Sequence, residues 1–172
     1  MDLTARLRVI PDFPTAGVSF KDITPLLQNP QAWQYCIDSL KEACGGLEFD
    51  LIVAPEARGF ILGSTLAYAL GKGFAPVRKA GKLPGPTVQG EYLLEYGSDV
   101  LEIHKDAVTP GQKVLIIDDV LATGGTIAAT IDLVRKLGGI IAGVGFLIEL
   151  NYLQGRDQLG DYPVVSVLCL DA

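Results

Sequence analysis

Residues 114–126 contain the side chains best suited to bind a charged ligand, and they read Val-Leu-Ile-Ile-Asp-Asp-Val-Leu-Ala-Thr-Gly-Gly-Thr. The four apolar residues at 114–117 predict a buried parallel strand, and the carboxylates of Asp118 and Asp119 follow at its carboxyl end. From Gly125 onward apolar residues recur at helical spacing, so we expect the turn to end at a helix N-terminus. Such an end presents unpaired N–H groups and the positive end of the helix dipole, which favour an anion.

The turn itself has the composition of a phosphate site. Gly124 and Gly125 let the backbone approach an anion because no Cβ stands in the way, and Thr123 and Thr126 add hydroxyl donors. Together these residues predict a site for a monophosphate.

The two carboxylates suggest the rest of the ligand. Asp118 and Asp119 are poor phosphate ligands but good acceptors for a pair of sugar hydroxyls, or for Mg²⁺ held by those hydroxyls, so a ribose 5-phosphate would suit both halves. Two alternatives remain open on local evidence. A strand that ends in Asp-Asp also occurs in phospho-acceptor and Mg²⁺-dependent hydrolase sites, and a glycine pair after a strand is often only a turn.

Two further segments carry basic side chains after predicted strands. Arg58 stands beside Gly59 where a helix is expected to start after the strand at 51–54, which indicates a second anion site, although a surface arginine in a helix cap is the plainer reading. Arg78 and Lys79 end the strand predicted at 74–77, and Lys82 follows. This basic cluster needs a local anionic partner because the chain as a whole is acidic.

Composition limits the class of protein. At 172 residues the chain is most simply one domain, and a net charge of −6 argues against a nucleic-acid surface. No apolar run is long enough to cross a membrane, and the first residues lack the basic and apolar blocks of a signal peptide, so we expect a soluble cytoplasmic protein. The cysteines at 36, 44 and 169 lack metal or disulfide spacing; we expect Cys36 and Cys169 to be buried and the single histidine, His104, to be solvated.

The remaining pattern predicts an α/β fold. We expect a short helix at 2–10, an irregular but ordered loop at 11–25 and an amphipathic helix at 31–44. Residues 80–89 are rich in glycine and proline and predict a mobile segment without secondary structure, followed by an antiparallel excursion at 91–96 and 100–104. Strands at 140–148 and 164–170 complete a doubly wound, mainly parallel sheet of about five strands flanked by helices.

The chain resembles a known family. The residues that carry the resemblance are Pro11-Asp-Phe-Pro14, Phe20-Lys-Asp-Ile23, Glu56-Ala-Arg-Gly-Phe60, Arg78-Lys79, Gly81-Lys-Leu-Pro84, Leu94-Glu-Tyr-Gly97, Leu101-Glu-Ile103 and the 114–126 segment. In this order they are similar to the adenine branch of the type I phosphoribosyltransferases. The resemblance implies a cytoplasmic purine salvage enzyme that makes AMP and pyrophosphate from adenine and phosphoribosyl pyrophosphate (PRPP) with Mg²⁺. It also implies a homodimer that binds neither nucleic acid nor membrane.

The resemblance also implies roles for individual residues. Ribose hydroxyls would be held by Asp118 and Asp119, and the 5-phosphate by Ala122, Thr123, Gly124, Gly125 and Thr126. Pyrophosphate would be bound by Glu56, Ala57, Arg58, Arg78, Lys79 and Lys82, with a cis peptide expected at Glu56–Ala57. Adenine would meet Ser19, Phe20 and Lys21, although plain packing of Phe13 and Phe20 is the simpler local reading. Glu95 would handle a proton of adenine, with Tyr96 beside it in the lid, and Mg²⁺ would be held through the substrate without a protein cage.

The implied organisation is one domain over 1–172, with a hood at about 1–28, a core at about 29–172 and a flexible lid at about 80–96. Two other functions stay open. One is another purine phosphoribosyltransferase, and the other is a PRPP-sensing regulator without catalysis.

Overall fold

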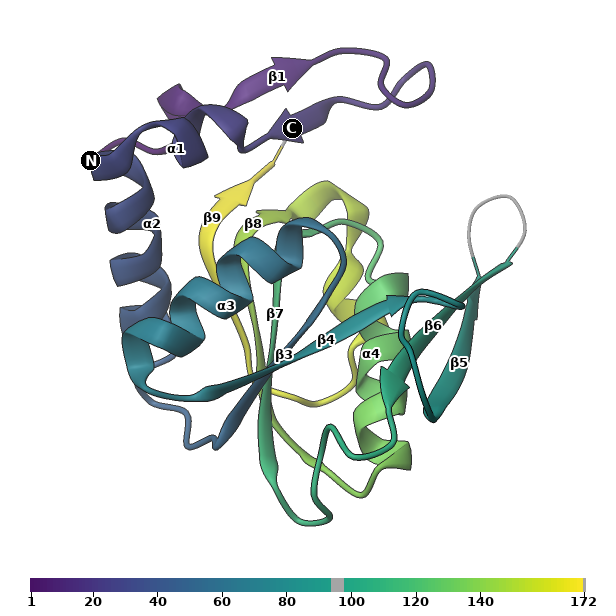
Figure 1. The fold of residues 1–172 in the computed structure, drawn as a ribbon. Helices are drawn as coiled ribbons and strands as arrows, with labels where there is room; N and C mark the ends of the chain where they lie inside the picture. The colour runs from purple at the N-terminus through teal and green to yellow at the C-terminus, as the bar shows by residue number, and fades with distance from the viewer. Residues whose placement is uncertain (94–97, 172) are drawn as a thin grey trace. The chain divides into compact units, whose positions relative to one another are not determined.

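The computed structural model describes residues 1–93 and 98–171 (Figure 1). The chain forms two compact units, Met1–Ser39 and Leu40–Ala172, and the helix α2 (Pro30–Ala43) contains the boundary between them.

A mixed sheet forms the framework of the second unit. Within the described residues it has seven strands in the order β5-β6-β4-β3-β7-β8-β9. The strands are β3 (Leu51–Pro55), β4 (Gly73–Lys79), β5 (Thr87–Leu93), β6 (Ser98–His104), β7 (Lys113–Leu121), β8 (Ile140–Leu150) and β9 (Val164–Leu170). Pairing is parallel from β4 across β3, β7 and β8 to β9, which confirms the predicted parallel core.

The predicted excursion is part of this sheet. Strand β6 pairs antiparallel with both β4 and β5, so the sheet has two strands more than the expected five. The expectation that residues 80–89 form no element is wrong at its end, because Thr87–Gln89 belong to β5. Alternation predicts a hairpin but not the strand to which it pairs, because that pairing depends on distant residues.

Two helices cover the opposite faces of the sheet. The crossover β3–α3–β4 runs towards one edge and β7–α4–β8 towards the other, which places α3 (Arg58–Leu70) in front of the sheet and α4 (Gly125–Lys136) behind it (Figure 1). Leu51 and Val53 belong to the buried core that also contains the apolar side of α4. The alternate residue Ala54 faces α3, where a Cβ added to Gly63 would lie 2.9 Å from the Cβ of Ala54. Close packing therefore fixes α3 against the strand that precedes it.

The first unit contains a two-stranded ribbon. A 3-10 turn η1 (Thr4–Arg6) is followed by β1 (Arg8–Ile10), which pairs antiparallel with β2 (Phe20–Asp22), and α1 (Thr24–Gln28) follows. The helix predicted at 2–10 is therefore wrong. Its apolar spacing fits a helical period, but β1 gains cross-strand hydrogen bonds and an ion pair of 3.5 Å between Arg8 Nη1 and Asp22 Oδ2.

Two smaller expectations also have clear outcomes. Cys36 is buried as expected, but Cys169 is exposed because it lies on β9, an edge strand of the sheet. No helix of the described part of the chain has the length and apolarity needed to cross a membrane.

Candidate active site

The two carboxylates lie near the carboxyl end of β7, in the middle of the sheet. Asp118 is partly buried and Asp119 is 4% exposed. Burial raises the pKa of Asp118 well above its usual range, and the neighbouring charge of Asp119 raises this pKa further. Burial also raises the pKa of Asp119, although the Arg58 guanidinium opposes that shift. A ligand that donates hydrogen bonds to this pair would favour its ionised form.

The N-terminus of α3 closes over the carboxylate pair. Arg58 Nε lies 2.6 Å from Asp119 Oδ2, yet this buried oxygen accepts no hydrogen bond within the described residues, so the contact is an ion pair with poor hydrogen-bond direction. A Cβ added to Gly59 would lie 2.8 Å from Asp118 Oδ1. A glycine is therefore required where the helix approaches the strand, and Arg58 is brought directly to the predicted ribose site.

A small hollow follows the carboxylates. It has a volume of about 80 Å³ and is lined by residues 118 and 120–127. Pockets for whole organic ligands are typically about 300–1,000 Å³, so this hollow suits a single phosphate group. Gly124 stands at the N-cap of α4 with φ +89°, a conformation that favours glycine, and the helix directs its first N–H groups at the hollow.

The phosphate-sized hollow is supported from behind by a segment that the sequence did not indicate. A Cβ added to Gly124 would lie 2.5 Å from the carbonyl oxygen of Gly155, at the start of the 3-10 helix η3 (Gly155–Gln158). Arg156 holds this segment to β8, because its Nε and Nη2 donate to Glu149 Oε1 and Oε2 at 2.5 and 2.7 Å. Ser166 Oγ donates to the same carboxylate at 2.6 Å. The Arg156 contact lowers the pKa of Glu149.

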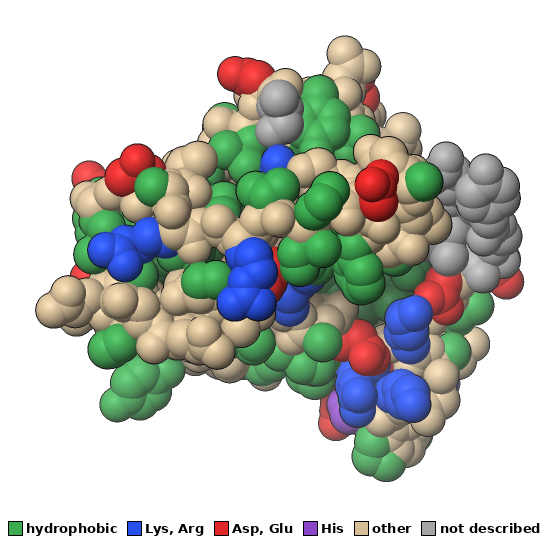
Figure 2. Space-filling model, turned by 90° about the horizontal axis from the view of Figure 1, so that it is seen from above, with side chains coloured by type: hydrophobic (Ala, Val, Ile, Leu, Met, Phe, Trp, Pro, Cys, Tyr) green, Lys and Arg blue, Asp and Glu red, His purple; other side chains and the backbone are tan. Residues whose placement is uncertain are grey.

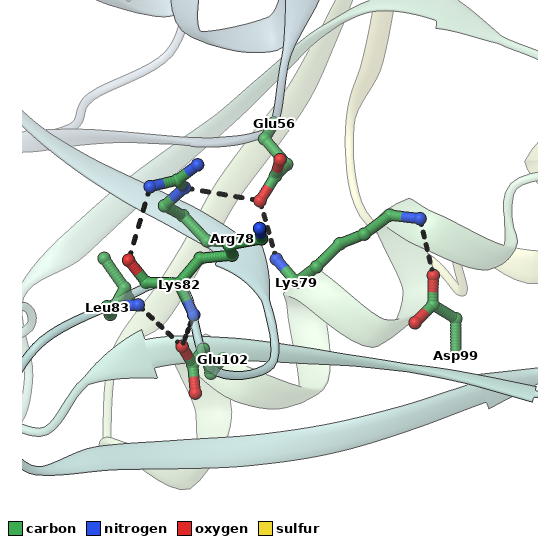
Figure 3. Close-up of polar contacts among 7 residues, drawn as sticks. All are labelled: Glu56, Arg78, Lys79, Lys82, Leu83, Asp99 and Glu102. Atoms are coloured by element: carbon green, nitrogen blue, oxygen red, sulfur yellow. Dashed lines mark hydrogen bonds and ion pairs between the residues drawn. The ribbon is translucent and has the colours of Figure 1, made fainter.

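The loop after β3 is joined to β4 by one carboxylate. The Glu56–Ala57 peptide is cis, which confirms that expectation. Glu56 Oε1 accepts hydrogen bonds from the backbone N–H of Lys79 at 2.8 Å and from Arg78 Nε at 3.3 Å (Figure 3). The Glu56 carboxylate therefore joins the loop after β3 to the basic residues at the end of β4.

The predicted basic cluster lies at the end of β4 and in the loop that follows it. Lys79 Nζ forms an ion pair of 2.9 Å with Asp99 Oδ2, a partner on β6 that the sequence did not suggest, and Lys82 lies in the exposed loop that follows β4. His104 Nε2 lies 2.9 Å from the carbonyl oxygen of Pro84 in the same loop. Figure 2 shows basic side chains gathered beside the molecule's one histidine, with acidic side chains among them.

The remaining predicted site residues are those assigned to adenine and to the lid. Glu95 and Tyr96 lie outside the described residues. Ser19, Phe20 and Lys21 belong to the first unit, where the Phe20 ring packs edge-on against Phe13 with a centroid separation of 5.2 Å. The two rings therefore pack against each other, and the adenine contact of Phe20 stays a prediction.

The described residues contain no group of three or more His, Cys, Asp or Glu side chains that could hold a metal ion. Asp118 and Asp119 supply oxygen ligands of the kind that Mg²⁺ prefers, but Arg58 competes for one of them. These residues fit a Mg²⁺ ion bound mainly by oxygens of a substrate.

Comparisons with known proteins agree with this geometry. A family model described as "Phosphoribosyl transferase domain" matches residues 22–168. An adenine phosphoribosyltransferase of Pseudothermotoga lettingae is 58% identical over 98% of this chain and 99% of its own length. The crystal structure of the adenine phosphoribosyltransferase from Thermoanaerobacter pseudethanolicus superposes with a TM-score of 0.97 at 55% identity, covering 98% of each chain. That of Saccharomyces cerevisiae, complexed with adenine and D-2,5-dideoxy-2,5-imino-altritol 1,6-bisphosphate, has a TM-score of 0.91 at 45% identity and covers 97% of each chain.

Proposed function

Because this chain belongs to the adenine phosphoribosyltransferase family, we propose that it transfers the 5-phosphoribosyl group of PRPP to adenine, giving AMP and pyrophosphate in purine salvage. The observation that carries the proposal is the placement of a partly buried and a buried carboxylate, Asp118 and Asp119, directly before a hollow of about 80 Å³ at a helix N-terminus. Acceptors for sugar hydroxyls and donors for one phosphate thus stand side by side on a single strand, turn and helix.

The ribose 5-phosphate half of PRPP would occupy this strand end. Asp118 and Asp119 accept hydrogen bonds from the ribose hydroxyls, while residues 122–126 receive the 5-phosphate through backbone N–H groups and threonine hydroxyls. The buried Asp119 Oδ2, which accepts no hydrogen bond among the described residues, gains a donor in this arrangement. Arg58 then leaves Asp119 for the pyrophosphate, since an anion of higher charge competes with one carboxylate.

The basic residues act on the leaving group. As the bond between ribose and pyrophosphate breaks, negative charge accumulates on pyrophosphate and positive charge on the sugar. Arg58, Arg78, Lys79 and Lys82 stabilise the first of these charges, and the carboxylates beside the ribose stabilise the second. Mg²⁺, carried by PRPP, supplies additional charge neutralisation.

The contacts with adenine would come from residues that the family resemblance assigns to the base. Phe20 stacks on adenine, Ser19 and Lys21 read its edge through backbone groups, and Glu95 accepts a proton from the base, with Tyr96 next to it in the lid. These roles rest on the family resemblance.

We further propose that the protein is a cytoplasmic homodimer and that each chain forms a single domain. Its support is the family together with two exposed apolar side chains on α3, Ile61 at 39% and Tyr68 at 90% exposure. Sedimentation should give twice the mass of the 172-residue chain, and a fully active monomer would contradict this part of the proposal.

The decisive experiment is a turnover assay with PRPP and each of adenine, hypoxanthine, guanine and orotate, with and without a chelator of Mg²⁺. We expect AMP and pyrophosphate from adenine alone, and loss of turnover with the chelator. Turnover of hypoxanthine or guanine in place of adenine would favour the other purine transferases. PRPP binding without turnover of any base would favour a regulator.

A further inference from the structure

Glu102 is a buried carboxylate next to a loop whose proposed ligand is an anion. It lies on β6, and it is only 2% exposed. Its neighbours Leu101 and Ile103 belong to the core beside α4, so strand alternation turns Glu102 to the opposite face. In the sheet register Glu102 lies opposite Arg78 on β4 and opposite Gln89 on β5. It is therefore placed between the point where the loop at 80–86 leaves the sheet and the point where it returns.

The hydrogen bonds of Glu102 go to this loop and its return strand. Oε1 accepts from the backbone N–H groups of Lys82 at 2.9 Å and Leu83 at 2.8 Å (Figure 3). Oε2 accepts from Thr87 Oγ1 at 3.4 Å and from Gln89 Nε2 at 3.3 Å. The backbone hydrogen bond from Leu83 lowers the pKa of Glu102, which keeps the carboxylate ionised at neutral pH.

The neighbouring arginine completes the arrangement. Among the described residues Arg78 forms no ion pair with Glu102, although the two are cross-strand neighbours; it pairs with Glu56 and donates from Nη1 to the carbonyl oxygen of Lys82 at 3.3 Å. The backbone of Lys82 is thus held at its N–H by Glu102 and at its carbonyl by Arg78. Within the part of the chain that the structure describes, no hydrogen bond or ion pair engages the exposed Lys82 ammonium.

We propose that Glu102 is a positioning residue that orders the 80–86 loop so that the Lys82 ammonium can meet the pyrophosphate group of PRPP. This inference rests on the proposed function. A carboxylate near a polyanionic ligand would repel it if exposed, but here its charge is buried and directed at two backbone N–H groups. Ordering the loop before the ligand arrives lowers the entropic cost of binding, and a displacement of about 1 Å at such a site can cost about 10²-fold in rate.

A double-mutant cycle with direct pyrophosphate binding tests the inference. Calorimetry would give the Kd of Mg²⁺-pyrophosphate for the full-length protein and for Glu102→Ala, Lys82→Ala and the double variant. We expect each single variant to weaken binding about tenfold, and the double variant to bind no more weakly than Lys82→Ala. Glu102→Gln, whose amide oxygen still accepts from the loop, should weaken binding by roughly threefold, because a hydrogen bond to a charged acceptor is the stronger one.

Thr87→Val is the matched control, because it removes a donor to Oε2 and leaves both loop N–H groups bonded to Oε1. It should bind pyrophosphate like the unchanged protein. The inference would be overturned if Glu102→Ala weakened pyrophosphate binding by the same factor in the presence and in the absence of the Lys82 side chain. Equal rises in KM for PRPP and for adenine in Glu102→Ala would also overturn it. If Glu102→Ala does not fold, the same cycle with Glu102→Gln decides the matter by the same criterion. Pyrophosphate binding is measured without turnover, so a failure of the proposed reaction is distinguishable from a failure of this inference.

Discussion

Replacement of Gly124 by alanine should damage the phosphate-sized hollow in two separable ways. The backbone of Gly124 has φ +89°, which costs a residue with a Cβ about 1–2 kcal/mol. The added Cβ would also lie 2.5 Å from the carbonyl oxygen of Gly155 and 3.0 Å from Cβ of Gln158, where overpacking typically costs about 1–3 kcal/mol. The combined loss of unfolding free energy is therefore about 2–5 kcal/mol, which for a chain of this size lowers Tm by about 4–20 °C.

The same collision should weaken substrate binding. An ordinary contact needs about 3.4 Å, so the turn at 122–126 and the η3 segment would have to separate by nearly 1 Å. A displacement of that size at a binding site can cost about 10²-fold, so we expect kcat/KM for PRPP to fall by about 10–100-fold. KM for adenine should change much less.

Gly111→Ala provides the matched control. Gly111 has φ +83°, but a Cβ there would meet nothing within 4 Å, so this variant carries the backbone cost alone and should lose about 1–2 kcal/mol. Thermal unfolding and steady-state kinetics of the two variants would be compared. If Gly124→Ala had the Tm of Gly111→Ala and an unchanged KM for PRPP, the argument that η3 supports the hollow would be refuted.

Two further predictions concern carboxylates. The folded-state pKa of Asp118 is raised, so its favourable contribution to stability is present at low pH and is lost as pH rises through that pKa. Asp118→Asn should therefore raise Tm at neutral pH and lower turnover, and the gain in Tm should shrink towards pH 4. A lower Tm of this variant at neutral pH would contradict the argument. Glu95→Gln should reduce kcat by about 10²–10⁴ with little change in PRPP binding; if kcat stayed within a few-fold of the unchanged protein, Glu95 would position the base rather than handle its proton.

Local chemistry in the sequence was sufficient to predict the units that we propose bind the ligand. The strand at 114–117, the carboxylates after it and the glycine-threonine turn lie within thirteen consecutive residues, and helix α4 begins at the end of this segment, so their order needs no information from elsewhere. The same holds for the strand and helix on either side of Arg58. Periodicity and turn chemistry are local properties, and they specify these units well.

Tertiary structure decided what holds those units in place. A strand, β1, formed where a helix was expected because it pairs with β2. The local pattern did not show this pairing, since β2 lies ten or more residues further along the chain. The hydrogen bonds from Lys79 to Glu56 and from Lys82 to Glu102 join residues 23 and 20 positions apart, and the support of Gly124 by Gly155 spans a longer separation. Such contacts depend on strand order and register, which a local pattern does not contain. The sequence by itself therefore determined the strand, turn and helix that carry the proposed ligand-binding residues, and the fold determined which carboxylates contact the basic segment.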